Sequence, residues 1–280
     1  MTCAQALDAA RAAGLERLDA QWLLLHALGK PVANRAWLLA RGDDGLEQDV
    51  ADAFGSLVQR RAGGEPLAYI VGSKEFFGLP FQVDTRVLVP RPDTETLVQW
   101  SLDILLTVST PPMLQVLDLG TGSGAIALSI AHSLRAAGRS ARIVAVDASP
   151  DALDVARENA RLLGLDVAFV ESCWFEKVSS SFHLIASNPP YIASADPHLA
   201  ALTHEPLQAL TAGADGLDDI RRIVERAPNH LLPGGWLLME HGYDQSPQVR
   251  ELLQQRGFGQ VQSCDDLVGI ERCSGGKWSL

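Results

Sequence analysis

From residue 92 onward, short apolar runs alternate with helical patterns, and most runs stop at a polar residue or a glycine. The apolar runs predict five strands: Leu114–Leu119, Arg142–Asp147, Val167–Val170, His183–Ala186 and Trp236–Met239. One helical pattern, 94–106 with Asp93 as its cap, precedes the first strand, and three lie between strands: 124–137, a helix beginning at Ser149-Pro150, and 216–232. Strands that alternate with helices indicate an α/β fold, a parallel sheet with helices on both faces.

The first part of the chain has a different pattern. Leu18, Trp22 and Leu25 share one face of a predicted helix and are expected in a core, and a second periodic stretch runs over 46–60. Gly63-Gly64-Glu65-Pro66 ends this helical part, and the β-forming residues of 67–89 predict a β-hairpin. We therefore expect an N-terminal helical domain (1–66), a hairpin linker (67–89) and a larger α/β domain (90–280).

Composition excludes several classes of protein. With 47% hydrophobic and 20% charged residues the chain is not intrinsically disordered. It has no apolar run near the roughly 18 residues of a membrane span and no signal-peptide layout at its start. Its four cysteines form no C-x-x-C pair, so we expect reduced thiols in a cytoplasmic protein and no metal site. The net charge of −11 argues against stable binding to nucleic acid.

A glycine loop follows the first predicted strand: Gly120-Thr121-Gly122-Ser123-Gly124, preceded by Asp118. Glycines let the backbone turn sharply and approach a ligand closely. Ligands of open α/β sheets bind at the carboxyl ends of the strands, where Asp147 could accept hydrogen bonds from both hydroxyls of a ribose. The loop fits a dinucleotide fingerprint and also the first motif of S-adenosylmethionine-dependent methyltransferases; a plain strand-to-helix turn is the third interpretation. Taken alone it indicates an adenosine-containing cofactor.

Asn188-Pro189-Pro190-Tyr191 directly follows the fourth predicted strand and is expected at the same sheet edge. Each proline removes a backbone donor and fixes φ, so the segment is a stiff turn with free carbonyl oxygens. The Asn188 side-chain oxygen and the Pro189 carbonyl could each accept one N–H of a planar –NH2 group, and the Tyr191 ring could stack on its flat face. A nitrogen held in this way gains positive charge as it attacks a methyl sulfonium, and the two acceptors would stabilise that charge. The tetrapeptide therefore favours S-adenosylmethionine over a nicotinamide cofactor.

The chain resembles the release factor glutamine methyltransferases, the HemK/PrmC family, over nearly its whole length. The matching segments are Gly64–Ile70, Phe76–Leu79, Val89–Glu95, the glycine loop, Ser187–Ile192, Glu205-Pro206 and Ala209-Leu210. Asn-Pro-Pro-Tyr is shared with enzymes that methylate amino groups of adenine or guanine. The stretch Pro90-Arg91-Pro92-Asp93-Thr94-Glu95 is much more specific.

The resemblance implies a class I methyltransferase (Rossmann-like) sheet joined by a β-hairpin to a small N-terminal helical domain that recognises the partner. It implies a cytoplasmic enzyme of translation termination that methylates N5 of the glutamine in the Gly-Gly-Gln motif of class 1 peptide-chain release factors. Carried onto this sequence, Gly120, Thr121, Gly122, Ser123, Gly124, Asp147, Trp174 and Asn188 would bind S-adenosylmethionine. Asn188, Pro189, Pro190 and Tyr191 would bind the glutamine, with Asn188, Pro189 and Tyr191 as the catalytic residues.

Alternative interpretations remain open on the sequence. The first is a methyltransferase acting on adenine N6 or guanine N2 of nucleic acid, which would use the same tetrapeptide on a flipped base. Others are an NAD-dependent dehydrogenase and a scaffold that binds cofactor without turnover. Arg91 and Glu205 are further candidates for the cleft, and for Arg91 an ion pair with a nearby acid is the structural alternative.

Overall fold

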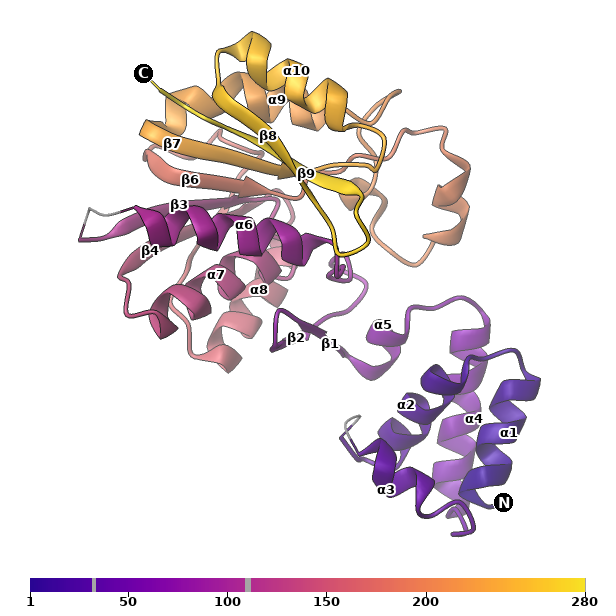
Figure 1. Ribbon diagram of the computed structural model, residues 1–280. Helices are drawn as coiled ribbons and strands as arrows, with labels where there is room; N and C mark the ends of the chain where they lie inside the picture. The colour runs from indigo at the N-terminus through magenta and orange to yellow at the C-terminus, as the bar shows by residue number, and fades with distance from the viewer. Residues whose placement is uncertain (32–33, 109–111, 280) are drawn as a thin grey trace. The chain divides into compact units, whose positions relative to one another are not determined.

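The structure, a computed structural model, describes residues 1–31, 34–108 and 112–279. The chain divides into two compact units, Met1–Ser73 and Lys74–Leu280 (Figure 1). The boundary lies seven residues beyond the predicted end of the helical part, because Leu67–Val71 forms a short helix, α5, instead of the start of a hairpin. Gly72 ends α5 with a φ of 72°, a left-handed conformation that glycine adopts without strain.

The first unit is helical. Besides α5 it contains α1 (Cys3–Ala12), α2 (Arg17–Ala27), α3 (Arg35–Leu39) and α4 (Gln48–Ala62). Leu23, Leu24 and Leu25 of α2 are fully buried, whereas Leu18 is 42% exposed, so the prediction of Leu18 as a core residue is wrong. The buried face of α2 is centred on Ala20, Leu23 and Leu24, at i, i+3 and i+4, which turns Leu18 outward.

The hairpin is shorter than the predicted 67–89. Strands β1 (Ser73–Phe76) and β2 (Leu79–Gln82) form a two-stranded sheet, and residues 83–89 form no strand. The side chain of Asn159 accepts a hydrogen bond from Gln82 N at 2.7 Å and donates to Gln82 O at 3.0 Å. Its amide also donates to the Ser123 carbonyl at 2.9 Å, which ties the hairpin to the glycine loop.

The second unit contains a seven-stranded sheet of order β5-β4-β3-β6-β7-β9-β8. The five predicted strands are present as β3 (Leu114–Leu119), β4 (Ala141–Asp147), β5 (Ala168–Glu171), β6 (Phe182–Ser187) and β7 (Leu231–Glu240). Two further strands, β8 (Gly259–Asp265) and β9 (Glu271–Lys277), were not predicted. The sheet is mixed, because β9 runs antiparallel to both of its neighbours.

Helices cover both faces of this sheet. Figure 1 shows α6 (Thr94–Thr107), α7 (Ala125–Ala136) and α8 (Pro150–Leu163) on one side and α9 (Asp218–Arg226) and α10 (Ser246–Arg256) on the other. Alternate strand residues such as Leu117, Ile185 and Leu237 pack in one core with Ile223 of α9 and Leu253 of α10. This is the layered architecture that the alternating pattern predicts.

Helix boundaries agree with the sequence in part. Ser149 caps α8 as predicted, accepting a hydrogen bond from Ala152 N at 3.2 Å. Asp93 occupies the cap position of α6 but makes no capping hydrogen bond; its carboxylate lies 3.5 Å from Arg272 instead. The helix predicted over 216–232 ends at Arg226 and continues as a 3-10 turn with Pro228, which lacks the N–H that an α-helix needs.

Gly275 of β9 allows α6 to pack closely on the sheet. A Cβ at this position would lie 2.4 Å from Leu238 Cδ2, 2.6 Å from the Leu237 oxygen and 3.0 Å from the Trp100 ring. Gly275→Ala is expected to lower the free energy of unfolding by about 1–3 kcal/mol, because the packed sheet cannot accept the methyl group. The urea-denaturation midpoint of the Lys74–Leu280 unit measures this.

Gly259→Ala is the matched control on the neighbouring strand, since its Cβ would come no closer than 3.6 Å to another atom, Ser279 Oγ. Equal midpoints for the two variants would contradict the packing argument.

Candidate active site

Pairing of β3 with β6 brings the two sequence motifs together. Leu119 is in register with Ser187, and the Ser187 hydroxyl donates to the Leu119 carbonyl at 2.8 Å. The next residues along the two strands are Gly120 and Asn188. They are neighbours: a Cβ built on Gly120 would lie 3.9 Å from the Asn188 backbone oxygen.

A pocket opens at this sheet edge. Eight of the predicted site residues line it: Gly120, Thr121, Gly122, Ser123, Asp147, Trp174, Asn188 and Pro190. Gly124, Pro189 and Tyr191 do not line it. The remaining wall contains residues that sequence reasoning left out, among them Arg86, Thr94, Ser172, Asp219 and Arg222.

The glycine loop needs glycine for two different reasons. Gly120 and Gly122 have φ values of 72° and 53°, and the Gly122 N–H donates to the Asp147 carboxylate at 2.9 Å. Gly124 begins α7 with a φ of 84°, and a Cβ there would lie 2.9 Å from Leu128 Cδ1. Gly124 therefore serves helix packing, which explains its absence from the pocket wall.

Two carboxylates lie behind and beside this loop. Asp118 is fully buried and accepts hydrogen bonds from Thr121 Oγ1 at 2.7 Å and Ala127 N at 3.2 Å; burial raises its pKa to about 7. Asp147 lines the pocket and accepts from the Gly122 and Ser149 amides, both at 2.9 Å; burial raises its pKa as well. Asp118 thus holds the loop, and Asp147 presents a carboxylate to the pocket.

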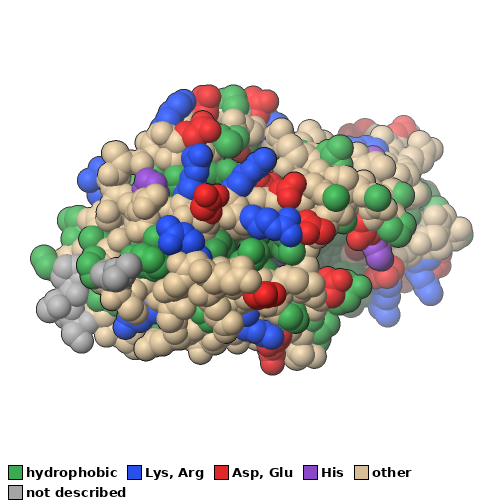
Figure 2. Space-filling model, turned by 90° about the horizontal axis from the view of Figure 1, so that it is seen from above, with side chains coloured by type: hydrophobic (Ala, Val, Ile, Leu, Met, Phe, Trp, Pro, Cys, Tyr) green, Lys and Arg blue, Asp and Glu red, His purple; other side chains and the backbone are tan. Residues whose placement is uncertain are grey.

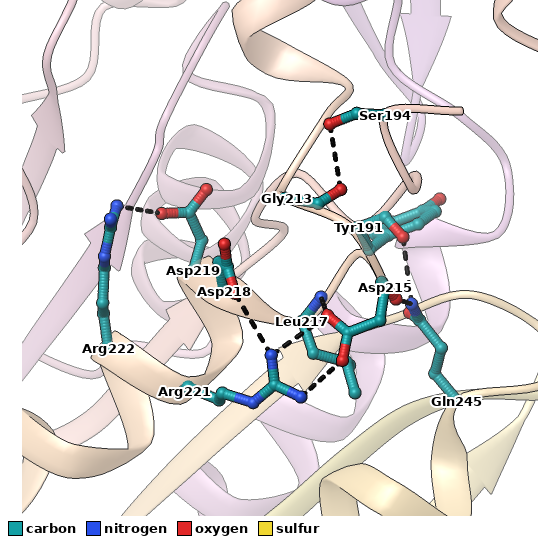
Figure 3. A network of polar contacts seen from close by, with 10 residues as sticks. All are labelled: Tyr191, Ser194, Gly213, Asp215, Leu217, Asp218, Asp219, Arg221, Arg222 and Gln245. Carbon is teal, nitrogen blue, oxygen red and sulfur yellow. Dashed lines mark hydrogen bonds and ion pairs between the residues drawn. The ribbon is translucent and has the colours of Figure 1, made fainter. Parts of the chain in front are cut away.

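Trp174 forms a wall of the pocket opposite the glycine loop. Its ring carbon Cζ3 would lie 3.4 Å from a Cβ on Gly120, and its backbone has a φ of 48°. The indole N–H donates to Asp219 Oδ1 at 3.2 Å, and Arg222 pairs with the same carboxylate at 3.1 Å. Figure 3 shows the Asp219–Arg222 pair at the start of α9. Asp219 therefore fixes the orientation of the ring.

Polar contacts hold the Asn188–Tyr191 segment from several elements. The Asn188 side-chain amide donates to Thr94 Oγ1 at 3.2 Å, and the Tyr191 hydroxyl donates to Glu240 Oε1 at 3.1 Å. The Tyr191 carbonyl accepts from Gln245 Nε2 at 3.0 Å (Figure 3). The Tyr191 ring packs against the core on the α9 and α10 face. The predicted stacking of this ring on a bound group stays a prediction.

Arg91 and Glu205 form the ion pair that the sequence left as an alternative. The Glu205 side chain is 3% exposed; it pairs with Arg91 and accepts a hydrogen bond from Val89 N at 3.1 Å. Arg91 also lines the pocket. The pair joins the segment before α6 to the loop between β6 and α9.

The donor set fits an adenosylated cofactor: two left-handed glycines, a carboxylate at the end of β4 and an indole ring face one cavity. Within residues 1–31, 34–108 and 112–279, no group of three His, Cys, Asp or Glu side chains is arranged to hold a metal ion. The four cysteines carry free thiols.

Most of the missed residues come from strand ends or helix starts. Ser172 follows β5, and Thr94 and Asp219 stand in the first turns of α6 and α9. The rule that ligands bind at the carboxyl edge could have found Ser172 from sequence. Thr94 lies in the Pro90–Glu95 stretch that carries the resemblance, but neither that stretch nor the residues around Asp219 indicate a contact with the pocket, because tertiary contacts bring both side chains there.

Comparisons with known proteins agree with this geometry. The family model described as "PrmC N-terminal domain" matches residues 2–72, and that described as "Methyltransferase domain" matches residues 112–268. A release factor glutamine methyltransferase of Burkholderia pseudomallei is 47% identical, covering 98% of this chain and 96% of its own. A release factor glutamine methyltransferase of Bordetella pertussis is also 47% identical, covering 94% of this chain and 95% of its own.

Solved structures share the fold at lower identity. The hMettl16 catalytic domain, solved in complex with the MAT2A 3'UTR hairpin 6, has a TM-score of 0.57 at 18% identity, covering 80% of this chain and 81% of its own. The Thermus thermophilus 16S rRNA N2 G1207 methyltransferase, solved with AdoMet and guanosine, has a TM-score of 0.54 at 20% identity. The match covers 74% of this chain and 49% of that protein. These likenesses support the fold alone.

Gly120→Ala tests the cofactor pocket. The added methyl group would strain a left-handed backbone and take up pocket space in contact with the Trp174 ring, so we expect S-adenosylmethionine to bind about 5- to 30-fold more weakly, which corresponds to roughly 1–2 kcal/mol. Isothermal titration calorimetry measures the dissociation constant.

Gly138→Ala is the control, because Gly138 has a similar φ of 68° but no atom within 4 Å of its Cβ position. An equal loss of affinity in both variants would mean that backbone strain alone, and not the pocket, causes the effect.

Proposed function

Because the chain belongs to the release factor glutamine methyltransferase family, we propose that it methylates the side-chain amide nitrogen of the glutamine in the Gly-Gly-Gln motif of class 1 peptide-chain release factors. It is an S-adenosylmethionine-dependent methyltransferase. The observation that carries the proposal is the position of Asn188. Its amide is anchored at Nδ2 by Thr94 and borders the pocket beside the glycine loop, which leaves Oδ1 as an acceptor for an incoming –NH2 group.

The cofactor is assigned to the pocket around Gly120–Gly124. Asp147 retains lone pairs to accept ribose hydroxyls, the Gly120 and Gly122 backbones allow close approach, and the Trp174 ring offers a flat surface for adenine. When bound there, S-adenosylmethionine supplies an electrophilic methyl group.

The residues of the Asn188–Tyr191 segment position the nucleophile. The Asn188 side-chain oxygen and the adjoining Pro189 carbonyl would accept the two N–H groups of the glutamine amide. Contact of the Tyr191 ring with the flat face of the amide stays a prediction, because the ring does not line the described pocket. An amide nitrogen is a weak nucleophile, and no Ser–His or Cys–His pair borders the described pocket, so transfer is direct and in line. Positioning can supply about 7–11 kcal/mol of the barrier, and the acceptors stabilise the charge that develops on nitrogen. The proton then leaves to water.

The N-terminal helical part, residues 1–66, is assigned to recognition of the release factor. Its match to the PrmC N-terminal domain supports this role. None of the helices in the described part of the chain has the length and apolar character needed to cross a bilayer.

A nucleic-acid methyltransferase is the competing function. Figure 2 shows Lys and Arg side chains interspersed with Asp and Glu on the visible face, without the continuous basic surface that binds a phosphate backbone. The net charge of −11 argues in the same direction. Incubation with labelled cofactor and either a release factor or nucleic acid separates the two functions: label on protein supports the proposal, and label on nucleic acid overturns it.

Asn188→Ala should lower kcat for release factor methylation by about 10²–10³-fold, the loss expected for one preorganised polar group in a transition state. Its dissociation constant for S-adenosylmethionine should stay within about threefold of wild type, because Asp147 and the glycine loop are unchanged. Mass spectrometry of the Gly-Gly-Gln peptide, looking for one added methyl group, measures turnover.

Asn229→Ala is the control, since Asn229 is an exposed residue of the 3-10 turn after α9. Wild-type turnover by Asn188→Ala would contradict the proposed clamp.

A further inference from the structure

Glu240, the last residue of β7, is a buried carboxylate that the proposed mechanism does not use. It is 1% exposed. Its Oε1 accepts a hydrogen bond from the Tyr191 hydroxyl at 3.1 Å, whereas no group in the described residues hydrogen-bonds Oε2. Leaving a buried carboxylate oxygen without a full partner is costly, so its position calls for a functional explanation.

Thr94 connects this carboxylate to Asn188. The Thr94 hydroxyl interacts with Glu240 and favours its ionised form, and Thr94 Oγ1 accepts from Asn188 Nδ2 at 3.2 Å. Thr94 is 4% exposed and lines the pocket. Glu240 is thus linked to both polar side chains of the Asn-Pro-Pro-Tyr segment, directly to Tyr191 and through Thr94 to Asn188.

The charge of Glu240 sets the direction of these contacts. An ionised carboxylate can only accept hydrogen bonds, so the Tyr191 hydroxyl donates to it, and the charge favours the orientation of the nearby Thr94 hydroxyl in which its hydrogen points toward the carboxylate. With its hydrogen turned toward Glu240, the Thr94 hydroxyl offers its oxygen to Asn188 as an acceptor. The Asn188 amide therefore turns its –NH2 end toward Thr94. The Asn188 side-chain oxygen is thereby turned to the other side, toward the pocket.

We propose that Glu240 is a positioning residue that orients the Asn188 amide through Thr94 and fixes the Tyr191 ring, so that the segment presents acceptors to the substrate amide. This inference rests on the proposed function and deepens it. Glu240 does not line the described pocket and acts through the two residues that it orients.

The neighbouring charges make this arrangement sensitive to pH. The pKa of Glu240 is raised to about 7, mainly by burial and also by Asp93 at the start of α6, while Thr94, Tyr191 and Arg272 of β9 act to lower it. The buried thiol of Cys273 on β9 also faces the carboxylate. His241, which directly follows β7, has a pKa lowered by burial and hydrogen-bonds to Gly242 O and Ser274 Oγ.

Burial and Glu240 raise the pKa of Tyr191 well above its ordinary value, and Arg272 and Arg91 lower it by less. Tyr191 therefore stays protonated and donates across the physiological range. When Glu240 is protonated, its O–H can donate to the Thr94 or Tyr191 oxygen. The donor and acceptor roles in the hydrogen bonds from Glu240 to Asn188 are then no longer fixed. Turnover should fall as pH decreases through about 7.

Glu240→Gln and Thr94→Val test the inference in the full-length enzyme with a purified class 1 release factor. The glutamine amide carries a donor that can reverse the contact with Thr94, and valine removes the hydroxyl. Each should lower kcat about 10- to 100-fold, the range for loss of a hydrogen bond to a charged group, and leave the S-adenosylmethionine dissociation constant within about threefold. Thr94→Ser, which keeps the hydroxyl, should restore turnover to within about threefold of wild type.

The pH profile separates positioning from a general structural role. The wild type should lose kcat below about pH 7, and the low kcat of both Glu240→Gln and Thr94→Val should be flat between about pH 6 and 8. The inference is overturned if Glu240→Gln keeps the wild-type kcat and profile, or if kcat and cofactor affinity fall together in both variants. Failure of the wild type to methylate the release factor would instead refute the proposed function.

Discussion

The hydrogen-bonded register between β3 and β6 is the constraint on which the candidate site depends. It aligns Leu119 with Ser187, so that the strands end together and the glycine loop begins beside Asn188. The Ser187 hydroxyl reinforces the alignment by donating to the Leu119 carbonyl. A slip of one residue would invert which side chains of β6 face the core, and the apolar packing on both faces of the sheet forbids it. Cofactor loop and proposed substrate clamp are therefore positioned by sheet pairing and not by loop flexibility.

Buried carboxylates complete the same sheet edge. Asp118, Asp147 and Glu240 end or nearly end β3, β4 and β7, and burial raises the pKa of each. Each nevertheless accepts hydrogen bonds from the segment that it holds: the glycine loop, the turn before α8, or Tyr191. A carboxylate can only accept in its ionised form, so it imposes a direction on neighbouring hydroxyl and amide groups that an apolar core could not.

The sequence was sufficient to predict the alternating strands and helices of the larger domain. It was insufficient for elements whose structure depends on tertiary contacts. The five parallel strands are mostly apolar runs, and each was predicted, although β7 begins at Leu231, five residues before its predicted start and inside the predicted helix 216–232. Strand β9 reads Glu-Arg-Cys-Ser-Gly-Gly-Lys, whose glycines disfavour a strand in isolation, but Gly275 is required there because Trp100 and Leu238 leave no room for a side chain. In the site, motif residues were found because their spacing is local. Thr94, Asp219 and Glu240 were missed because each acts through a partner 45 or more positions away in the chain.

The side chain of Asn159 has a consequence beyond the glycine loop. It accepts from the N–H of Gln82 and donates to the carbonyl of the same residue, as the backbone of an adjacent strand would. A carboxamide has the same donor and acceptor geometry as a peptide group. Part of the open edge of the two-stranded hairpin is thereby closed from within the chain, which protects a short strand from pairing with a neighbouring molecule and aggregating.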